Sequence, residues 1–444
     1  MSGADTIFAL ASARGQTAVA IMRLSGPGAG GALQRLAGLP ALPAPRRATL
    51  AELRTPVDGE SLDRALVLWF PGPASFTGED VVELHLHGGL AVISGVTDAL
   101  TALALRPAEP GEFSRRAFLN GKMDLTEAEG LADLVAAETA AQRRQALRQL
   151  AGALGGLYES WRQRLIRIQA EVEAEIDFAD EADVPAGLLA AASGEIAALA
   201  DELAAHLDDS HRGERLREGL YIAILGPPNV GKSSLLNALA RREAAIVSST
   251  AGTTRDVIEV HLALGGYPAI LADTAGLREA LDEIEDEGVR RAKARAEAAD
   301  LRLLVLDAGA LEAGAAAVGG LIGEEALIVV NKTDLAAAPQ RVAGRPALAV
   351  SVKTGVGLAE LERALETAVR ARLDTGASPT LTRARHRAAL QAALASLRRA
   401  AAASEIELAG EDLRLAGREL GRITGRIDVE DILDIVFSSF CIGK

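Results

Sequence analysis

Apolar runs of strand length alternate with helical patterns over the first quarter of the 444-residue chain. Apolar residues at helical spacing predict helices at Ala32 to Ala37 and Ala91 to Leu103. Runs of apolar and β-branched residues predict strands at Thr17 to Leu24, Ala65 to Phe70 and Val81 to Leu86. Residues 1–122 are therefore predicted to form a compact mixed α/β domain, a sheet with helices packed on it.

Helical periodicity then dominates from Leu125 to about Ala205, where Glu, Gln, Arg and Ala stand between apolar positions. We expect breaks at Gly152, at Gly155-Gly156 and from Asp180 to Pro185. A second helical pattern runs from Thr382 to Leu420, and we expect its arginines to form a solvated face: Arg383, Arg385, Arg387, Arg398 and Arg399. Because neither stretch has a sheet of its own, both are predicted to build one helical domain with a further domain inserted.

Two linkers are predicted around the inserted domain, at Asp208 to Glu218 and at Asp374 to Pro379. Four residues in or beside the first linker resemble metal ligands, although the charge pattern favours a solvated linker: His206, Asp208, Asp209 and His211. Between the linkers, apolar runs are each followed by a polar motif. This order predicts an α/β nucleotide-binding domain over residues 216–372.

The first of these motifs is a glycine-bounded loop within Ala223 to Leu236. Gly226 and Gly231 let backbone N–H groups curl around an anion, and the following helix points its positive end at it. Lys232 adds a compact ammonium, and Ser233 offers a hydroxyl to Mg²⁺. The strand-loop-helix context predicts a phosphate-binding loop.

Three further motifs indicate which nucleotide binds. Asn331-Lys332-Thr333-Asp334 follows a strand-like run, so Asp334 can accept both N–H donors on the Watson–Crick edge of guanine, a pair that adenine lacks. Asp273-Thr274-Ala275-Gly276 is placed to reach Mg²⁺ and to sense the γ-phosphate. Ser351-Val352-Lys353 is a weaker element that would close over the base. The order of these motifs predicts a GTPase.

Composition narrows the classes of partner. Aromatic residues make up only 3% of the chain, which favours aliphatic helix packing over stacking platforms for bases. A net charge of −14 opposes a direct, nonspecific grip on nucleic acid. The single cysteine, Cys441, excludes an internal disulfide framework. With no secretory segment and no apolar run long enough to span a bilayer, we expect a soluble cytoplasmic protein.

Lysine is rare, because only six of the 47 basic residues are Lys. The chain thus carries Arg at positions where either cation would do. The six lysines should therefore mark sites that need a small ammonium group. Three of them lie in the nucleotide motifs. Lys122 and Lys444 are therefore candidate ligand contacts.

Another candidate site lies on the strand from Val81 to His87. Alternation places Glu83, His85 and His87 on one face of it. A metal site is one interpretation, but one flat strand cannot converge three ligands on one ion. A polar ligand pocket is the better interpretation.

Six further motifs stand along the chain: Phe76-Thr77-Gly78-Glu79-Asp80, His87-Gly88-Gly89, Pro110-Gly111-Glu112-Phe113-Ser114, Ala117-Phe118-Leu119-Asn120-Gly121-Lys122-Met123-Asp124-Leu125, Gly252-Thr253-Thr254-Arg255-Asp256 and Phe440-Cys441-Ile442-Gly443-Lys444. With the nucleotide motifs they resemble the tRNA modification GTPase family (MnmE, also called TrmE) over essentially the whole length. The resemblance implies a multidomain α/β plus α chain. It would have an N-terminal α+β folate-binding and dimerisation domain (1–122), a helical domain in two parts (123–215 and 373–444) and an inserted Ras-like P-loop GTPase domain (216–372).

The resemblance also implies ligand contacts. Those to 5-formyl- or 5,10-methylene-tetrahydrofolate would fall on Arg23, Glu83, Lys122 and Lys444. Mg²⁺ would be held by Ser233 and Thr254, and K⁺, in the place of an arginine finger, by Asn229, Ser248, Thr250 and Thr253. GTP contacts would fall on Asn229, Val230, Gly231, Lys232, Ser233, Ser234, Ser248, Ser249, Thr250, Ala251, Gly252, Thr253, Thr254, Asp273, Thr274, Ala275, Gly276, Asn331, Lys332, Asp334, Ser351, Val352 and Lys353.

Two catalytic candidates remain open to a second interpretation. Leu277 stands where many GTPases carry the Gln that orients water, and the family's switch-region glutamate matches Glu285. Neighbouring acids also fit Glu285 as part of a solvated helix N-terminus. Cys441 would supply a thiolate near the folate or serve as a small buried hydrophobe. Its position fourth from the end does not fit prenylation, because Gly443 is not aliphatic and Lys444 is not a typical last residue.

The activity implied by the resemblance is K⁺-activated GTP hydrolysis in aminomethyl-type or carboxymethylaminomethyl modification at C5 of the tRNA wobble uridine. The implied partners are a second copy of the chain, an FAD-dependent protein (MnmG in this family) in a heterotetramer, and tRNA, with no membrane. A ribosome-assembly GTPase is an alternative and would want a basic RNA-binding appendix. A dynamin-like membrane GTPase is another and would want a lipid-facing patch.

Overall fold

The computed structural model describes residues 5–13, 15–177, 187–242, 259–273, 299–323, 325–376, 378–427, 430–438, 440 and 443. The chain divides into two compact units. The first unit comprises residues 1–132, 150–162 and 418–444, and the second comprises residues 133–149 and 163–417.

A six-stranded sheet forms the first part of the first unit, in the order β3-β4-β5-β2-β1-β6. Neighbouring strands are antiparallel except β1 and β6, which are parallel. The strands predicted near residues 17, 65 and 81 are confirmed, whereas the first, third and sixth strands were not predicted. The bounds are β1 Ile7–Leu10, β2 Thr17–Ser25, β3 Thr49–Arg54, β4 Ser61–Phe70, β5 Val81–Gly88 and β6 Arg106–Pro107.

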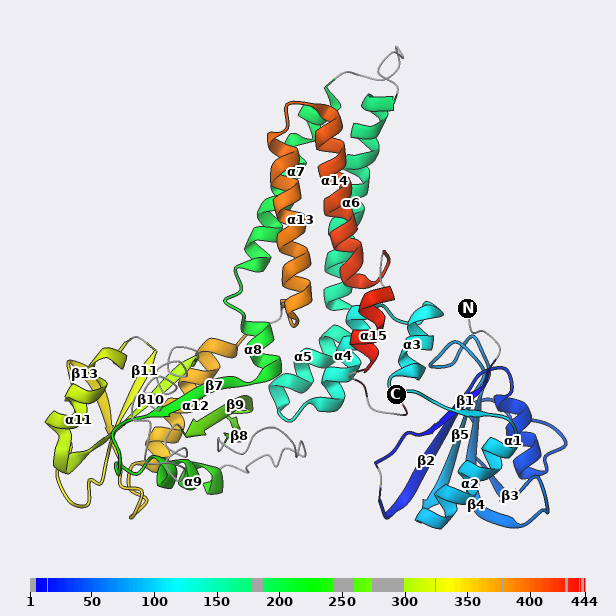
Figure 1. The fold of residues 1–444 in the computed structure, drawn as a ribbon, viewed down its shortest axis with the longest axis horizontal. Coiled ribbons are helices and arrows are strands. Elements are labelled where there is room, and N and C mark those ends of the chain that lie inside the picture. The colour runs from blue at the N-terminus through cyan, green and yellow to red at the C-terminus, as the bar shows by residue number, and fades with distance from the viewer. Residues whose placement is uncertain are drawn as a thin grey trace, which may run out of the picture. The chain divides into compact units, whose positions relative to one another are not determined.

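Helices α1 (Ala29–Ala37) and α2 (Leu90–Ala102) lie on one face of this sheet (Figure 1). Their apolar sides pack on buried strand residues such as Met22, Leu84 and Leu86. Burial of this apolar surface is the main force that holds the helices to the sheet. Because side chains alternate along each strand, Arg23, Glu83 and His85 lie on the opposite face from this core.

The C-terminal segment packs into the same unit. Helix α15 (Glu430–Ser438) lies against α3 (Glu112–Leu119), and its Phe437 packs with Leu125 of α4 (Leu125–Ala136) in a buried cluster. Gly111 has a φ of +69°, and a Cβ there would lie 2.4 Å from the carbonyl oxygen of Phe437. Glycine at this position therefore permits the close approach of the C-terminal segment.

Helices dominate the rest of the chain outside the second sheet, as predicted. In the second unit, α7 (Leu188–Leu207), α13 (Ala384–Ala402) and most of α6 (Ala153–Asp177) and α14 (Ile406–Thr424) run side by side (Figure 1). The break expected at Gly155-Gly156 is wrong, because both glycines lie inside α6. A Cβ at Gly155 would lie 2.2 Å from Asp124 Oδ2, so this glycine serves close packing instead.

A seven-stranded sheet forms the other part of the second unit, in the order β12-β13-β11-β10-β7-β9-β8. The five inner strands are parallel, and the edge strands β8 and β12 are antiparallel to their neighbours. The bounds are β7 Leu220–Leu225, β8 Glu259–Leu264, β9 Tyr267–Asp273, β10 Leu301–Asp307, β11 Ala326–Asn331, β12 Arg341–Val342 and β13 Arg345–Ala349.

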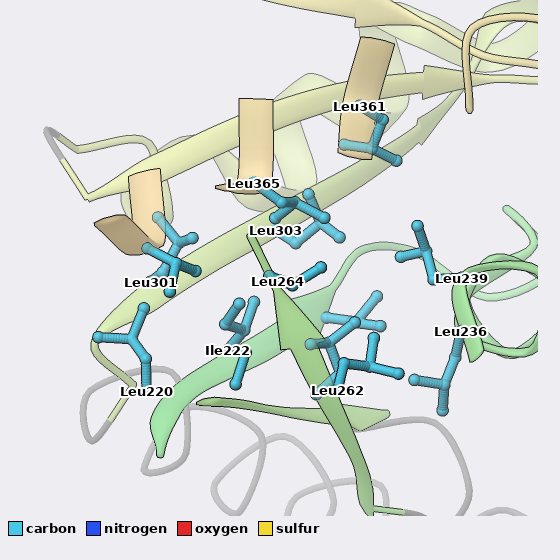
Figure 2. Packing of buried hydrophobic residues seen from close by; sticks show 14 of the residues in the cluster. Leu220, Ile222, Leu236, Leu239, Leu262, Leu264, Leu301, Leu303, Leu361 and Leu365 are labelled. Atoms are coloured by element: carbon cyan, nitrogen blue, oxygen red, sulfur yellow. The ribbon is translucent and has the colours of Figure 1, made fainter. Parts of the chain in front are cut away.

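The core of this sheet is a cluster of aliphatic side chains (Figure 2). Ile222 and Leu303 come from the central strands, Leu236 from α9 (Lys232–Arg242) and Leu361 from α12 (Leu358–Leu373). The near-continuous apolar runs of β7, β10 and β11 reflect burial on both faces, which is typical of parallel sheets. On the other face, α11 (Leu311–Val318) packs on β10 beside the short 3₁₀ turns η1 (Ala308–Ala310) and η2 (Gly319–Leu321).

The prediction of a solvated linker before this sheet is wrong. Residues Arg212–Glu218 form the helix α8, and two acids of the segment bind Arg387 of α13. The Arg387 guanidinium donates to Asp209 Oδ1 at 2.7 Å and to Glu214 Oε2 at 3.1 Å, and its side chain is only 11% exposed. The arginines of α13 were predicted to form one solvent-exposed face. Arg398 and Arg399, near the end of the helix, are exposed as predicted, but Arg387 is not.

Candidate nucleotide-binding site

The predicted nucleotide motifs follow the carboxyl ends of neighbouring parallel strands. β7 leads into the glycine-bounded loop and α9, β9 ends at Asp273, and β11 ends at Asn331. In an open α/β sheet, ligands bind at this edge. The register therefore brings together motifs that lie about a hundred residues apart in the sequence.

Two glycines give the loop after β7 its shape. Gly226 has a φ of +151°, and a Cβ there would lie 2.1 Å from the carbonyl oxygen of Val305. Gly231 has a φ of +96°, and a Cβ there would lie 2.5 Å from Asn331 Nδ2. Both positions therefore require glycine, for the backbone angle and for the space.

Lys232 and Ser233 follow directly at the start of α9. The Lys232 ammonium is buried and donates to the carbonyl oxygens of Gly226 and Pro227, both at 2.8 Å. The Ser233 hydroxyl donates to Asp273 Oδ2 at 2.5 Å, and Asp273 is 1% exposed. The structure thus brings together a cation, a hydroxyl and a carboxylate, the groups predicted for phosphate and Mg²⁺.

The loop after β11 is tied to this phosphate loop. Buried Asn331 donates through Nδ2 to the carbonyl oxygen of Val230 at 2.8 Å and accepts at Oδ1 from the N–H of Val352 at 3.2 Å. The Ser351 hydroxyl donates to Asp334 Oδ1 at 2.7 Å. That hydrogen bond lowers the pKa of the Asp334 carboxyl, which keeps it ionised as an acceptor for a base.

Three of the remaining predicted residues lie in the described ranges at the same edge of the sheet. Val230 is buried, Ser234 is exposed, and Lys353 contributes to the lowered pKa of Asp334. The following predicted residues lie outside the described ranges: Ser248, Ser249, Thr250, Ala251, Gly252, Thr253, Thr254, Thr274, Ala275, Gly276, Glu285, Cys441 and Lys444.

Sequence reasoning missed Asp307, which ends β10 at the same edge. The Lys332 ammonium donates to Asp307 Oδ2 and to the carbonyl oxygen of Asn229, both at 2.7 Å. A signal was present, because Asp307 follows an apolar run just as the predicted motifs do. Asp307 could not be singled out, because the residues around it form no recognisable motif.

A second polar group of residues lies on the face of the first unit's sheet that is opposite α1 and α2, beside the buried side chain of Phe113 from α3. The Arg23 guanidinium donates to Glu83 Oε1 at 2.9–3.0 Å and to the carbonyl oxygen of Gly443 at 3.5 Å. Its charge also lies 5.5 Å from the ring centroid of Phe76 and 5.9 Å from that of Phe113. The two rings, like Asp307, were not predicted as site residues.

The neighbours of Glu83 on its strand take different partners. His85 Nε2 lies 3.5 Å from Glu83 Oε2, whereas His87 Nδ1 lies 2.7 Å from Asp63 Oδ1. Lys122 donates to the carbonyl oxygen of Pro73 at 3.0 Å. The structure therefore groups Arg23 with Glu83 and the C-terminal Gly443, and gives Lys122 a separate contact.

In the described part of the chain, no helix combines the length and the apolarity needed to cross a membrane.

Two family models and several relatives of known name together match nearly the whole chain. A model described as the GTP-binding protein TrmE N-terminus matches residues 6–122, and one described as the MnmE helical domain matches residues 125–441. A tRNA modification GTPase MnmE from Paramagnetospirillum magneticum is 59% identical over 99% of this chain and 100% of its own length. One from Rhodospirillum rubrum is 61% identical over 99% of each chain. Among solved structures, the G domain of T. maritima FeoB is 27% identical over 34% of this chain and 98% of its own, with a TM-score of 0.28.

Proposed function

Because the chain belongs to the MnmE family of tRNA modification GTPases, we propose that it binds and hydrolyses GTP at the carboxyl edge of its seven-stranded sheet and thereby acts in tRNA modification. The main support is a pair of hydrogen bonds made by Asn331, the first residue of the loop Asn331-Lys332-Thr333-Asp334, here called the guanine loop. One joins it to Val230 of the phosphate loop and the other to Val352 of the segment 351–353. These contacts hold two recognition elements in a fixed relation before any ligand binds. Such preorganisation lowers the cost of binding.

At the phosphate end, Lys232 and the N–H groups at the start of α9 would neutralise the β- and γ-phosphates. Ser233 and Asp273 fit Mg²⁺, because a hydroxyl and a buried carboxylate, both oxygen ligands, already lie together. Thr254 would join them. Magnesium bound there would offset the charge that builds up on the phosphate oxygens.

We further propose a K⁺ site beside the phosphates. Asn229 would hold the ion together with Ser248, Thr250 and Thr253. Asn229 fits this role because its side-chain carbonyl oxygen can coordinate a hard monovalent ion. Its backbone, with a φ of +61°, is held in place because the backbone carbonyl oxygen accepts a hydrogen bond from Lys332. The ion would supply the positive charge that other GTPases take from an arginine.

Two roles complete the nucleotide chemistry. Asp334 would accept both N–H donors of guanine, so that adenine would leave the carboxylate without its partners. Glu285 would orient the attacking water, because Leu277 cannot do so. Hydrolysis would release the loops that the γ-phosphate holds and so drive a cycle of conformations.

For the tRNA chemistry, we propose that a tetrahydrofolate binds near Arg23 and Glu83. The ion pair fits this group, because a carboxylate can pair with a pterin edge and a guanidinium with a glutamyl carboxylate. Phe76, which is only partly buried, would add apolar surface for the ring, and the buried Phe113 would support the Arg23 guanidinium from the protein side. Lys122, Lys444 and the thiol of Cys441 would act at the same site.

The full proposal is a homodimer that works with an FAD-dependent partner, MnmG in this family, in a heterotetramer on tRNA. Methylene-tetrahydrofolate would supply the one-carbon unit for an aminomethyl-type group at C5 of the wobble uridine. Because the chain carries a net charge of −14, it should repel the phosphates of tRNA, and we expect the partner to supply most of the affinity for tRNA.

Mass spectrometry of wobble nucleosides tests this proposal. A strain that lacks the gene should lose the C5 modification, the wild-type chain should restore it, and Lys232→Ala should not. Cys441→Ser separates the two interpretations of the cysteine, since a catalytic thiolate predicts loss of modification and a buried hydrophobe predicts none. Unchanged nucleosides in the deletion strain would refute the role in tRNA modification.

A further inference from the structure

Asp307 is a charged residue at the carboxyl edge of the seven-stranded sheet, the edge that carries the nucleotide motifs. It belongs to none of the predicted motifs. It ends β10, and the parallel register pairs it with Asn331, which ends β11. Lys332 follows Asn331 directly, so the register alone sets a carboxylate and an ammonium at neighbouring positions of this edge. Asp307 Oδ2 and Lys332 Nζ lie 2.7 Å apart.

The Lys332 ammonium has a second partner on the phosphate loop. Nζ donates to the carbonyl oxygen of Asn229, again at 2.7 Å. Lys332 and Asn229 have φ values of +64° and +61°, a conformation that residues other than glycine rarely adopt. One ammonium group therefore links the guanine loop to the phosphate loop, at two residues whose backbones are held in an unfavourable conformation.

Asp307 is itself held in place. Its Oδ1 accepts from the N–H of Gly309 at 2.9 Å and caps the turn η1, while Oδ2 faces Lys332. The hydrogen bond from Lys332 is the largest of the causes that lower the pKa of this carboxyl, followed by that from Gly309. The carboxylate is thus ionised at neutral pH and has both oxygens engaged.

We propose that Asp307 is a positioning residue for guanine nucleotide binding. Its carboxylate orients the Lys332 ammonium, and Lys332 in turn fixes the Asn229 carbonyl and holds the phosphate loop in register with the guanine loop. This inference rests on the proposed function, because it concerns the same nucleotide site.

A residue that only caps η1 would not need a charge. Serine caps helical turns about as well as aspartate. Asp307→Ser therefore keeps an acceptor for the N–H of Gly309 but removes the partner of Lys332. Asp307→Asn changes the side chain less in shape and gives a second variant without the negative charge.

The test is the dissociation constant of GDP, measured by titration of the full-length chain. We expect Asp307→Ser and Asp307→Asn to weaken GDP binding about tenfold, which corresponds to about 1.4 kcal/mol. Asp300→Asn is the matched control, because Asp300 lies just before β10 at the opposite end of the same strand and pairs with Arg215 at 2.7 Å. That variant should bind GDP within twofold of wild type.

A double-mutant cycle separates positioning from general destabilisation. In a Lys332→Ala background, Asp307→Ser should change the dissociation constant less than twofold, because its effect passes through the ammonium. A tenfold loss in both backgrounds, or no loss in the wild-type background, would overturn the inference. If the wild-type chain does not bind GDP, the proposed function fails; if it binds GDP and Asp307 has no effect, only the positioning role fails.

Discussion

Replacing Arg387 with Met is expected to destabilise the second unit strongly. The Arg387 guanidinium binds three groups of the segment before β7: Asp209 Oδ1 at 2.7 Å, Glu214 Oε2 at 3.1 Å and the carbonyl oxygen of Leu207 at 2.9 Å. The acids are as buried as the arginine, with side chains 13% exposed against 11%. Methionine would fill the space of the methylene stem but leave both carboxylates without their cation.

The size of the effect follows from this burial. Removing one partner of a buried ion pair costs about 3–5 kcal/mol, because the remaining charge is left without compensation. At about 2–4 °C per kcal/mol for a unit of this size, the unfolding midpoint should fall by roughly 10 °C. The matched control is Arg399→Met on the same helix, where Arg399 pairs with Asp412 but is 55% exposed. An exposed pair contributes about 1 kcal/mol or less, so the control should shift the midpoint by no more than a few degrees.

Thermal unfolding of both variants at several pH values provides the assay. Burial raises the pKa of Glu214, but the hydrogen bonds from Arg387 and His211 outweigh it, so the pKa in the folded chain lies below its ordinary value. The stability from this group is therefore present above the unfolded pKa of about 4.3 and is lost as the pH falls through the folded value. The difference in unfolding midpoint between wild type and Arg387→Met should therefore become smaller at acid pH. Equal shifts for the two variants at neutral pH, or a gap that widens in acid, would refute the reasoning.

Three predictions concern the binding sites. Gly231→Ala should abolish detectable GTP binding, because its Cβ would lie 2.5 Å from Asn331 Nδ2 at a φ of +96°; equilibrium dialysis that finds wild-type affinity would contradict this. GTP turnover should fall steeply when Na⁺ replaces K⁺ and should lose this dependence in Asn229→Ala, whereas equal wild-type rates in both salts would exclude a K⁺ site. Arg23→Met should weaken binding of 5-formyl-tetrahydrofolate at least about tenfold in calorimetry, since it leaves Glu83 without its cation, and undiminished affinity would place the folate elsewhere.

The parts of the fold that could be predicted have a local cause. The strand-loop-helix segment around Lys232 combines an apolar run, two glycines and a helix former within a few residues, and each signal acts at short range. The four-residue strand Ile7–Leu10 was missed because it is too short to show a period. It is held instead by strands at Ser25 and Arg106, which no local pattern reveals.

The site shows the same limit. Asn331 and Asp334 could be predicted because their motif carries chemistry in four consecutive residues. Asp307 has meaning only through Lys332, 25 residues away, and the parallel register that pairs their strands is not visible in the sequence. The sequence pattern predicts a solvated Arg387, because its acid partners lie more than 170 residues earlier in the chain and no local pattern reveals them.

Guanine selectivity tests the central claim most directly. The dissociation constants of GDP and ADP should be measured side by side for the wild-type chain and for Asp334→Ala. We expect wild type to prefer GDP by a factor on the order of 10³ or more, and the variant to lose most of this preference through weaker GDP binding alone. Equal affinity of wild type for GDP and ADP, or a preference that survives the loss of the Asp334 carboxylate, would contradict the assignment of this edge as a guanine nucleotide site.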